Sequence, residues 1–149
     1  MGLILGFTGT RHHPTNEQVL WLHTQAKRAD IIHHGGCTGA DATIHTIALA
    51  FEIPVVVHPP TNTKHSDPRL IPGIAKSTGL VTILEPREYH HRDIDIVNEC
   101  ETLAATPDGP QRHGSGTWFT VEYARQISRP GLICYPDGTV EDLLLTTQG

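Results

Sequence analysis

The chain lacks any hydrophobic run long enough to cross a membrane. Its 149 residues are 38% hydrophobic, and the longest apolar runs fall far short of the ~20 residues that a membrane-spanning helix needs. No basic segment followed by an apolar stretch opens the chain, because residues 1–7 already have the pattern of a strand. Length and composition therefore predict a single globular domain, residues 1–149, with a cytoplasmic location and no membrane partner.

Positive charge and paired cysteines are also scarce. The formal net charge is −5 at pH 7, and broad nucleic-acid binding depends on basic patches, so a nucleic-acid partner is not expected. The cysteines Cys37, Cys100 and Cys134 are odd in number and show no C-x-x-C spacing. This predicts reduced thiols and excludes a disulfide framework.

The common nucleotide and metal motifs are missing. G-x-x-x-x-G-K-[ST] does not occur, which argues against a P-loop and phosphoryl transfer. The stretch "GSGTWF" begins like the dinucleotide fingerprint but has Phe119 where a third glycine is needed. The eleven histidines include neither H-E-x-x-H nor a Cys/His zinc pattern. Asp41 and His45, four residues apart, are the best pair for a metal, but we expect neither a metal nor a cofactor.

What the chain does contain is an alternation of short apolar runs with helical patterns. The expected strands are residues 3–7, 30–34, 53–60, 79–86, 102–106 and 131–138, and the expected helices are residues 14–29, 39–52, 92–103 and 117–127. Several of the strands are continuously apolar, which is typical of a parallel sheet buried on both faces. The pattern predicts an α/β Rossmann-like, doubly wound, mostly parallel sheet with helices on both faces.

Three glycine-bearing loops fall where such a sheet binds ligands. They are "TGTRHH" (8–13), "GGCTGAD" (35–41) and "RHGSGT" (112–117). Ligands of doubly wound sheets lie beyond the carboxyl ends of the strands, and glycines let backbone N–H groups approach an anion at a helix N-terminus. One loop alone is more often a tight turn. Together the three predict a site for a ligand that carries an anionic group.

Six blocks in series resemble the SLOG superfamily, and in particular its YspA/YpsA-related branch. The blocks are "GFTGTR", "HHGGCTGADATIHTIA", "IPVVVHPP", "RDIDIVNECETLAATPDGP", "GSGTWFTVEYAR" and "PGLICYPDG". This Rossmann-like group includes the DNA-processing A protein and the Lonely-guy phosphoribohydrolases. The resemblance implies a binding domain for nucleotides or their derivatives, including signalling nucleotides such as an ADP-ribose derivative.

The resemblance also implies which residues contact the ligand. They are Thr8, Gly9, Thr10, Arg11, Gly35, Gly36, Thr38, Gly39, Asp41, His58, Gly114, Ser115, Gly116 and Thr117. The two glycine loops would hold phosphate through backbone N–H groups and the Thr117 hydroxyl, and Arg11 would add a bidentate cation. Asp41 would either accept a hydrogen bond from a ribose hydroxyl or compensate the positive end of its own helix. His58 would project towards the same rim.

One departure from the family bears on catalysis. Lonely-guy enzymes carry G-G-x-G-T-x-x-E, whose glutamate acts in breaking an N-glycosidic bond, and Thr120 stands at that glutamate's position here. Glu122 is two residues further, about 200° around a helix. We therefore expect no catalytic residue, and a chain that senses, carries or sequesters its ligand. A nucleoside 5'-monophosphate N-glycosidase and a molybdenum-cofactor carrier remain the alternatives.

The resemblance implies a homo-oligomer as well, because related proteins pair through helices. Trp21, Leu22 and Tyr123 are apolar positions on amphipathic helices that suit such pairing.

Overall fold

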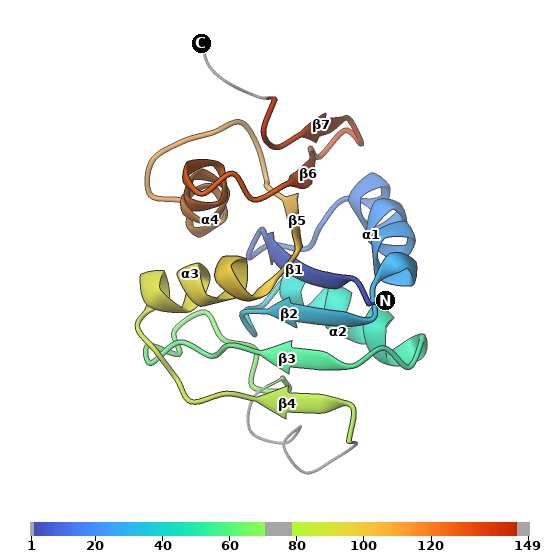
Figure 1. Ribbon diagram of the computed structural model, residues 1–149, viewed down its shortest axis with the longest axis vertical. Coiled ribbons are helices and arrows are strands. Elements are labelled where there is room, and N and C mark those ends of the chain that lie inside the picture. Colours follow the sequence, from blue (N-terminus) through green and yellow to red (C-terminus); the bar gives the residue numbers. More distant parts are fainter. Residues whose placement is uncertain (1, 71–78, 146–149) are drawn as a thin grey trace.

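The computed structural model describes residues 2–70 and 79–145 of the chain. Strands and helices alternate through these residues (Figure 1). The elements are β1 (Ile4–Gly9), α1 (Asn16–Arg28), β2 (Ile31–His34), α2 (Ala40–Ala50), β3 (Val55–Val57), β4 (Val81–Ile83), α3 (Tyr89–Glu99), β5 (Thr102–Thr106), α4 (Gly116–Gln126), β6 (Gly131–Cys134) and β7 (Val140–Asp142). No helix among them is long and apolar enough to cross a membrane.

The strands form one sheet in the order β4-β3-β2-β1-β5-β6-β7. The first six strands are parallel, and β7 pairs antiparallel with β6 at one edge. The expected α/β doubly wound fold is therefore confirmed. The sequence prediction omitted β7, because three residues at the end of the chain, two of them exposed, carry too little periodicity to be recognised.

Helices cover both faces of the sheet, with α1 and α2 on one face and α3 and α4 on the other (Figure 1). The alternation of side chains along β1 explains the two faces, because Leu5 and Phe7 point towards α1 and α2 while Gly6 points towards α3. A Cβ on Gly6 would lie 2.7 Å from the Cys100 sulfur. The glycine thus lets the end of α3 approach the sheet closely.

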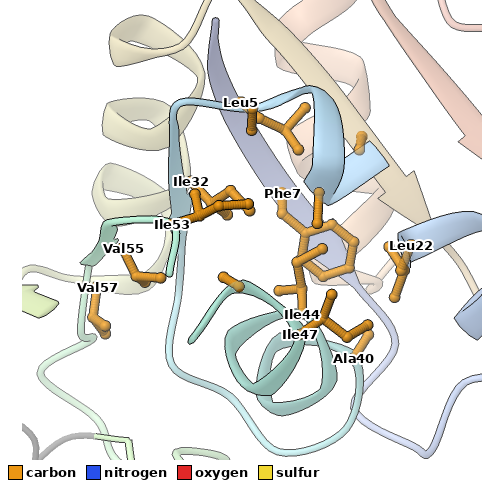
Figure 2. Close-up of a cluster of buried hydrophobic side chains, with 14 residues drawn as sticks. Leu5, Phe7, Leu22, Ile32, Ala40, Ile44, Ile47, Ile53, Val55 and Val57 are labelled. Carbon is orange, nitrogen blue, oxygen red and sulfur yellow. The ribbon is translucent and has the colours of Figure 1, made fainter. Parts of the chain in front are cut away.

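The larger hydrophobic core lies between the sheet and the α1–α2 layer. Phe7 is fully buried at its centre, between β1 and α2, with Leu22 from α1 and Ile44 from α2 beside it (Figure 2). Leu22 is therefore a core residue, so its expected place in a subunit contact is wrong. Trp21 and Tyr123 are partly buried.

The start of α1 is fixed to the end of the sheet that carries the expected site. Thr15 and Gln18 form a capping box at the start of α1. The buried Gln18 amide then donates to the carbonyls of Pro107 at 2.8 Å and Cys134 at 2.9 Å. These bonds tie α1 to the ends of β5 and β6, and so hold the loop after β1 in place.

Candidate ligand-binding site

A cavity of about 460 Å³ opens at the carboxyl ends of β1 and β5. β1 is flanked by β2 on one side and β5 on the other, so the chain order reverses direction at this point of the sheet. Such a switch point is where doubly wound sheets bind ligands, and the volume lies within the usual range of small-molecule sites.

Most of the expected contact residues line this cavity. Ten do so: Thr8, Gly9, Thr10, Arg11, Gly35, Asp41, Gly114, Ser115, Gly116 and Thr117. Four others, Gly36, Thr38, Gly39 and His58, are not among the described residues that line it. The loops after β1 and β2 and the loop before α4 therefore meet at one edge, as their order in the chain suggested.

The N-terminus of α4 presents unused hydrogen-bond donors to the cavity. The Ser115 hydroxyl caps the helix by accepting from the Trp118 N–H at 3.2 Å. The N–H groups of Gly116 and Thr117 have no partner within the described part of the chain. A Cβ on Gly116 would meet nothing within 4 Å. The partial positive charge of the helix end and the open space beside Gly116 suit an anionic group.

The loop after β2 is different, because its own chain uses its donors. The Gly36 N–H donates to His34 Nδ1 at 3.0 Å, and the Cys37 N–H donates to Asp41 Oδ2 at 3.1 Å. The Thr38 N–H donates to the His65 carbonyl at 2.9 Å. The phosphate contact assigned to this loop stays a prediction, but three of its N–H groups are already engaged.

Gly39 serves packing within the same loop. Its φ is +84°, and a Cβ there would lie 2.4 Å from backbone atoms of Arg11 and His12. This glycine allows the loops after β1 and β2 to touch.

Buried charges line the floor of the cavity. Arg92 is 5% exposed and donates through Nη1 to the carbonyls of Gly35 at 2.6 Å and His58 at 3.2 Å. Its Nε lies 2.6 Å from a carboxylate oxygen of Asp93. Its other terminal nitrogen lies 3.8 Å from the Cys37 sulfur. Arg92 thus joins α3 to the loops that follow β2 and β3.

Asp41 completes this group of charges from the start of α2. Its Oδ1 is buried and has no hydrogen-bond partner among the described residues. Burial raises the pKa of Asp41 to about 6, although the nearby Arg92 charge acts in the opposite direction. Burial likewise raises the pKa of Asp93 to about 6, again against the effect of Arg92. Burial and the Asp41 carboxylate raise the pKa of the Cys37 thiol to about 12, so this thiol is neutral.

Thr120 lies beneath the α4 end of the cavity. It is fully buried, and its hydroxyl donates to the Gly116 carbonyl at 2.9 Å. The Thr120 hydroxyl also lies beside the Asp93 carboxyl and acts to lower its pKa, in opposition to burial. The position that carries glutamate in Lonely-guy enzymes therefore contacts a carboxylate that α3 supplies.

The rim of the cavity carries exposed charges. The Arg11 guanidinium contacts the His65 ring, and the Arg112 guanidinium binds Asp108 at 2.6 Å. His90 stacks on Phe119, with ring centroids 4.1 Å apart. The cavity therefore combines cations and free N–H groups near its mouth with carboxylates on its floor.

The remaining candidate residues lie outside the cavity. His58 is 3% exposed and bonds to His33, with 2.7 Å between the two ring nitrogens. His45 bonds to His34 at 2.8 Å and does not join Asp41 in a metal-ligand cluster among the described residues. Burial lowers the pKa of His58 to about 4. Burial also lowers the pKa of His45 from its usual value.

No protein-family model matches the chain, and no curated protein matches its sequence. Solved structures that share its fold include the following two. The molybdenum cofactor binding protein from the phototrophic bacterium Rippkaea orientalis is similar with a TM-score of 0.65 and 15% identity, over 91% of this chain and 77% of that chain. The structural-genomics target TM1055 is similar with a TM-score of 0.62 and 17% identity, over 87% of this chain and 72% of that one. At these identities the likeness establishes a Rossmann-like fold.

Proposed function

We propose that this chain binds a phosphate-bearing nucleotide derivative in the cavity at the carboxyl ends of β1 and β5. The observation that carries the proposal is that one cavity holds both kinds of group such a ligand requires. Free N–H groups of Gly116 and Thr117 lie at one wall, and the unpartnered Oδ1 of Asp41 lies at the floor. The N–H groups match phosphate oxygens, and the carboxylate matches a hydroxyl donor.

The phosphate end of the ligand lies against the N-terminus of α4 in this proposal. The Thr117 hydroxyl and the guanidinium groups of Arg11 and Arg112 line the same cavity and add donors and positive charge. The sugar hydroxyls lie towards Asp41 and Asp93, which are the buried acceptors. The six sequence blocks that resemble SLOG proteins support the same assignment. Without a glutamate at position 120, the role is to sense, carry or sequester the ligand.

Matched glycine variants test this proposal. We expect nucleoside monophosphates or ADP-ribose to raise the melting temperature of the protein. In titration calorimetry, the matched nucleosides without phosphate should bind with at least about tenfold lower affinity. Gly116→Val should weaken nucleotide binding and leave folding intact, because its Cβ meets open space. Gly109→Val is the control, since its Cβ also meets nothing within 4 Å and it does not line the cavity. If the Gly116→Val and Gly109→Val variants bind the nucleotide with equal affinity, the phosphate assignment is wrong.

A molybdenum-cofactor carrier is the second candidate, favoured by the fold shared with the Rippkaea orientalis protein. Phosphate at the α4 end is common to both candidates, so the glycine variants do not separate them. Elemental analysis of the purified protein does. Molybdenum bound in stoichiometric amount would favour the carrier, and phosphorus without molybdenum would favour the nucleotide.

A further inference from the structure

Three side chains with metal-binding atoms meet on the α3 face of the sheet, outside the cavity. They are His33 on β2, His58 just after β3, and Glu99 at the end of α3. His33 Nδ1 lies 2.7 Å from His58 Nε2, and Glu99 Oε1 lies 3.6 Å from the first nitrogen and 3.9 Å from the second. Within residues 2–70 and 79–145 this is the one group of three such residues.

We propose that His33, His58 and Glu99 bind a divalent transition-metal ion of the zinc class. Zinc binds histidine nitrogen and carboxylate oxygen at about 2.0–2.2 Å, so neighbouring ligand atoms of a tetrahedral site are about 3.4 Å apart. The two distances to Glu99 are within about 0.5 Å of that value, and the two imidazoles need to separate by about 0.7 Å. Small side-chain rotations provide these changes.

The two imidazoles are held in place before any ion arrives. His33 is 7% exposed and lies within the sheet, where β2 pairs with β1 and β3. His58 is 3% exposed, its N–H donates to the His34 carbonyl at 2.8 Å, and its own carbonyl accepts from Arg92. Positions fixed by backbone bonds reduce the entropy that a metal site loses on binding.

Glu99 supplies the adjustable third ligand and the path to solvent. Its side chain is 49% exposed, so it can move towards the ion and leave a fourth position open to water. Arg92 donates to the His58 carbonyl, and the Asp93 carboxylate 2.6 Å from its Nε balances its charge. Without a cation, one ring N–H donates to the other ring nitrogen, and the Glu99 oxygen lies beside that hydrogen bond.

The ligand set also determines which ions fit. Two imidazole nitrogens favour zinc and its transition-metal neighbours. Magnesium and calcium prefer six or more oxygen ligands, so neither should compete. The bound ion would tie β2, the segment after β3 and the end of α3 together.

Zinc titration of the full-length protein, freed of metal by a chelator, tests the proposal. In competition with a chromophoric chelator, we expect one zinc ion per chain and no displacement by excess magnesium. Loss of a residue that hydrogen-bonds to a metal ligand typically weakens metal binding ~10–100-fold. Loss of a ligand itself, in His33→Gln, His58→Gln or Glu99→Gln, should therefore weaken zinc binding at least about tenfold. Zinc should also shift the ring ¹⁵N resonances of His33 and His58.

Control variants separate this site from adventitious surface binding. Two variants should bind zinc as the wild type does: His91→Gln, at an exposed α3 histidine, and Glu122→Gln, at a partly exposed α4 glutamate. If a buried histidine variant fails to fold, Glu99→Gln still tests the site because its side chain is half exposed. Zinc affinity unchanged in Glu99→Gln, or no stoichiometric binding to the wild type, would overturn the proposal. No nucleotide is present, so the result is independent of the proposed function.

Discussion

Replacing Asp41 by asparagine should stabilise the protein at neutral pH while weakening ligand binding. The side chain is 5% exposed, and its pKa rises from 3.8 to about 6 on folding. A raised pKa means that the folded state favours the protonated carboxyl, so this stabilisation is complete below pH ~4 and is lost as the pH rises through ~6. A difference of about two pKa units corresponds to about 3 kcal/mol at pH 7.5. Asparagine resembles the protonated carboxyl at every pH and removes this cost.

Urea denaturation between pH 4 and pH 8 measures the effect. The free energy of unfolding of Asp41→Asn should exceed that of the wild type by up to about 3 kcal/mol at pH 7.5 and converge with it near pH 4. Asp108→Asn is the control of opposite sign, because the Arg112 hydrogen bond lowers the pKa of Asp108. That variant should lose a little stability at neutral pH. If Asp41→Asn is no more stable than the wild type at pH 7.5, then burial does not raise the pKa of Asp41 as described.

Three further predictions follow from the α4 end of the cavity and from the family resemblance. In urea denaturation, Thr120→Glu should lower the free energy of unfolding by about 3 kcal/mol or more, because it buries a second carboxylate beside Asp93. Thr120→Val removes only the hydroxyl and should lower it by about 1 kcal/mol. A chromatographic assay with nucleoside monophosphates should detect no free base; turnover near one per second that is abolished in Asp93→Asn would establish a hydrolase instead. Light scattering should give a homo-oligomer, and a strict monomer at micromolar concentration would contradict that expectation.

The fold was predictable because its signal is local. Each apolar run between helical patterns became a strand, and the three glycine loops reached one edge because parallel strands share a direction. Leu22 was assigned to a subunit contact because the sequence of an amphipathic helix does not show whether its apolar face packs on the core or on another subunit. In the structure, Leu22 packs in the core with residues of β1 and α2.

The floor of the cavity was not predictable for the opposite reason. Arg92 and Asp93 are adjacent charges at the start of a helix, a pattern typical of a solvated face, and both are buried. Their burial depends on contacts with Gly35 and Thr120, which are far away in the sequence. The histidine–glutamate cluster was missed likewise, because residues 33, 58 and 99 have no motif spacing. A substitution at Gly36 would be strained whatever the ligand, because its φ is +73°.

We propose above that the cavity holds a phosphate-bearing ligand against the N-terminus of α4. The most direct measurement is mass spectrometry of the small molecules released when natively purified protein is denatured, performed side by side on the wild type and Gly116→Val. We expect the wild type to release a phosphorus-containing compound with free hydroxyls in near-stoichiometric amount, and the variant to release much less. A wild-type ligand without phosphate, or equal amounts of the same compound from both proteins, would contradict it.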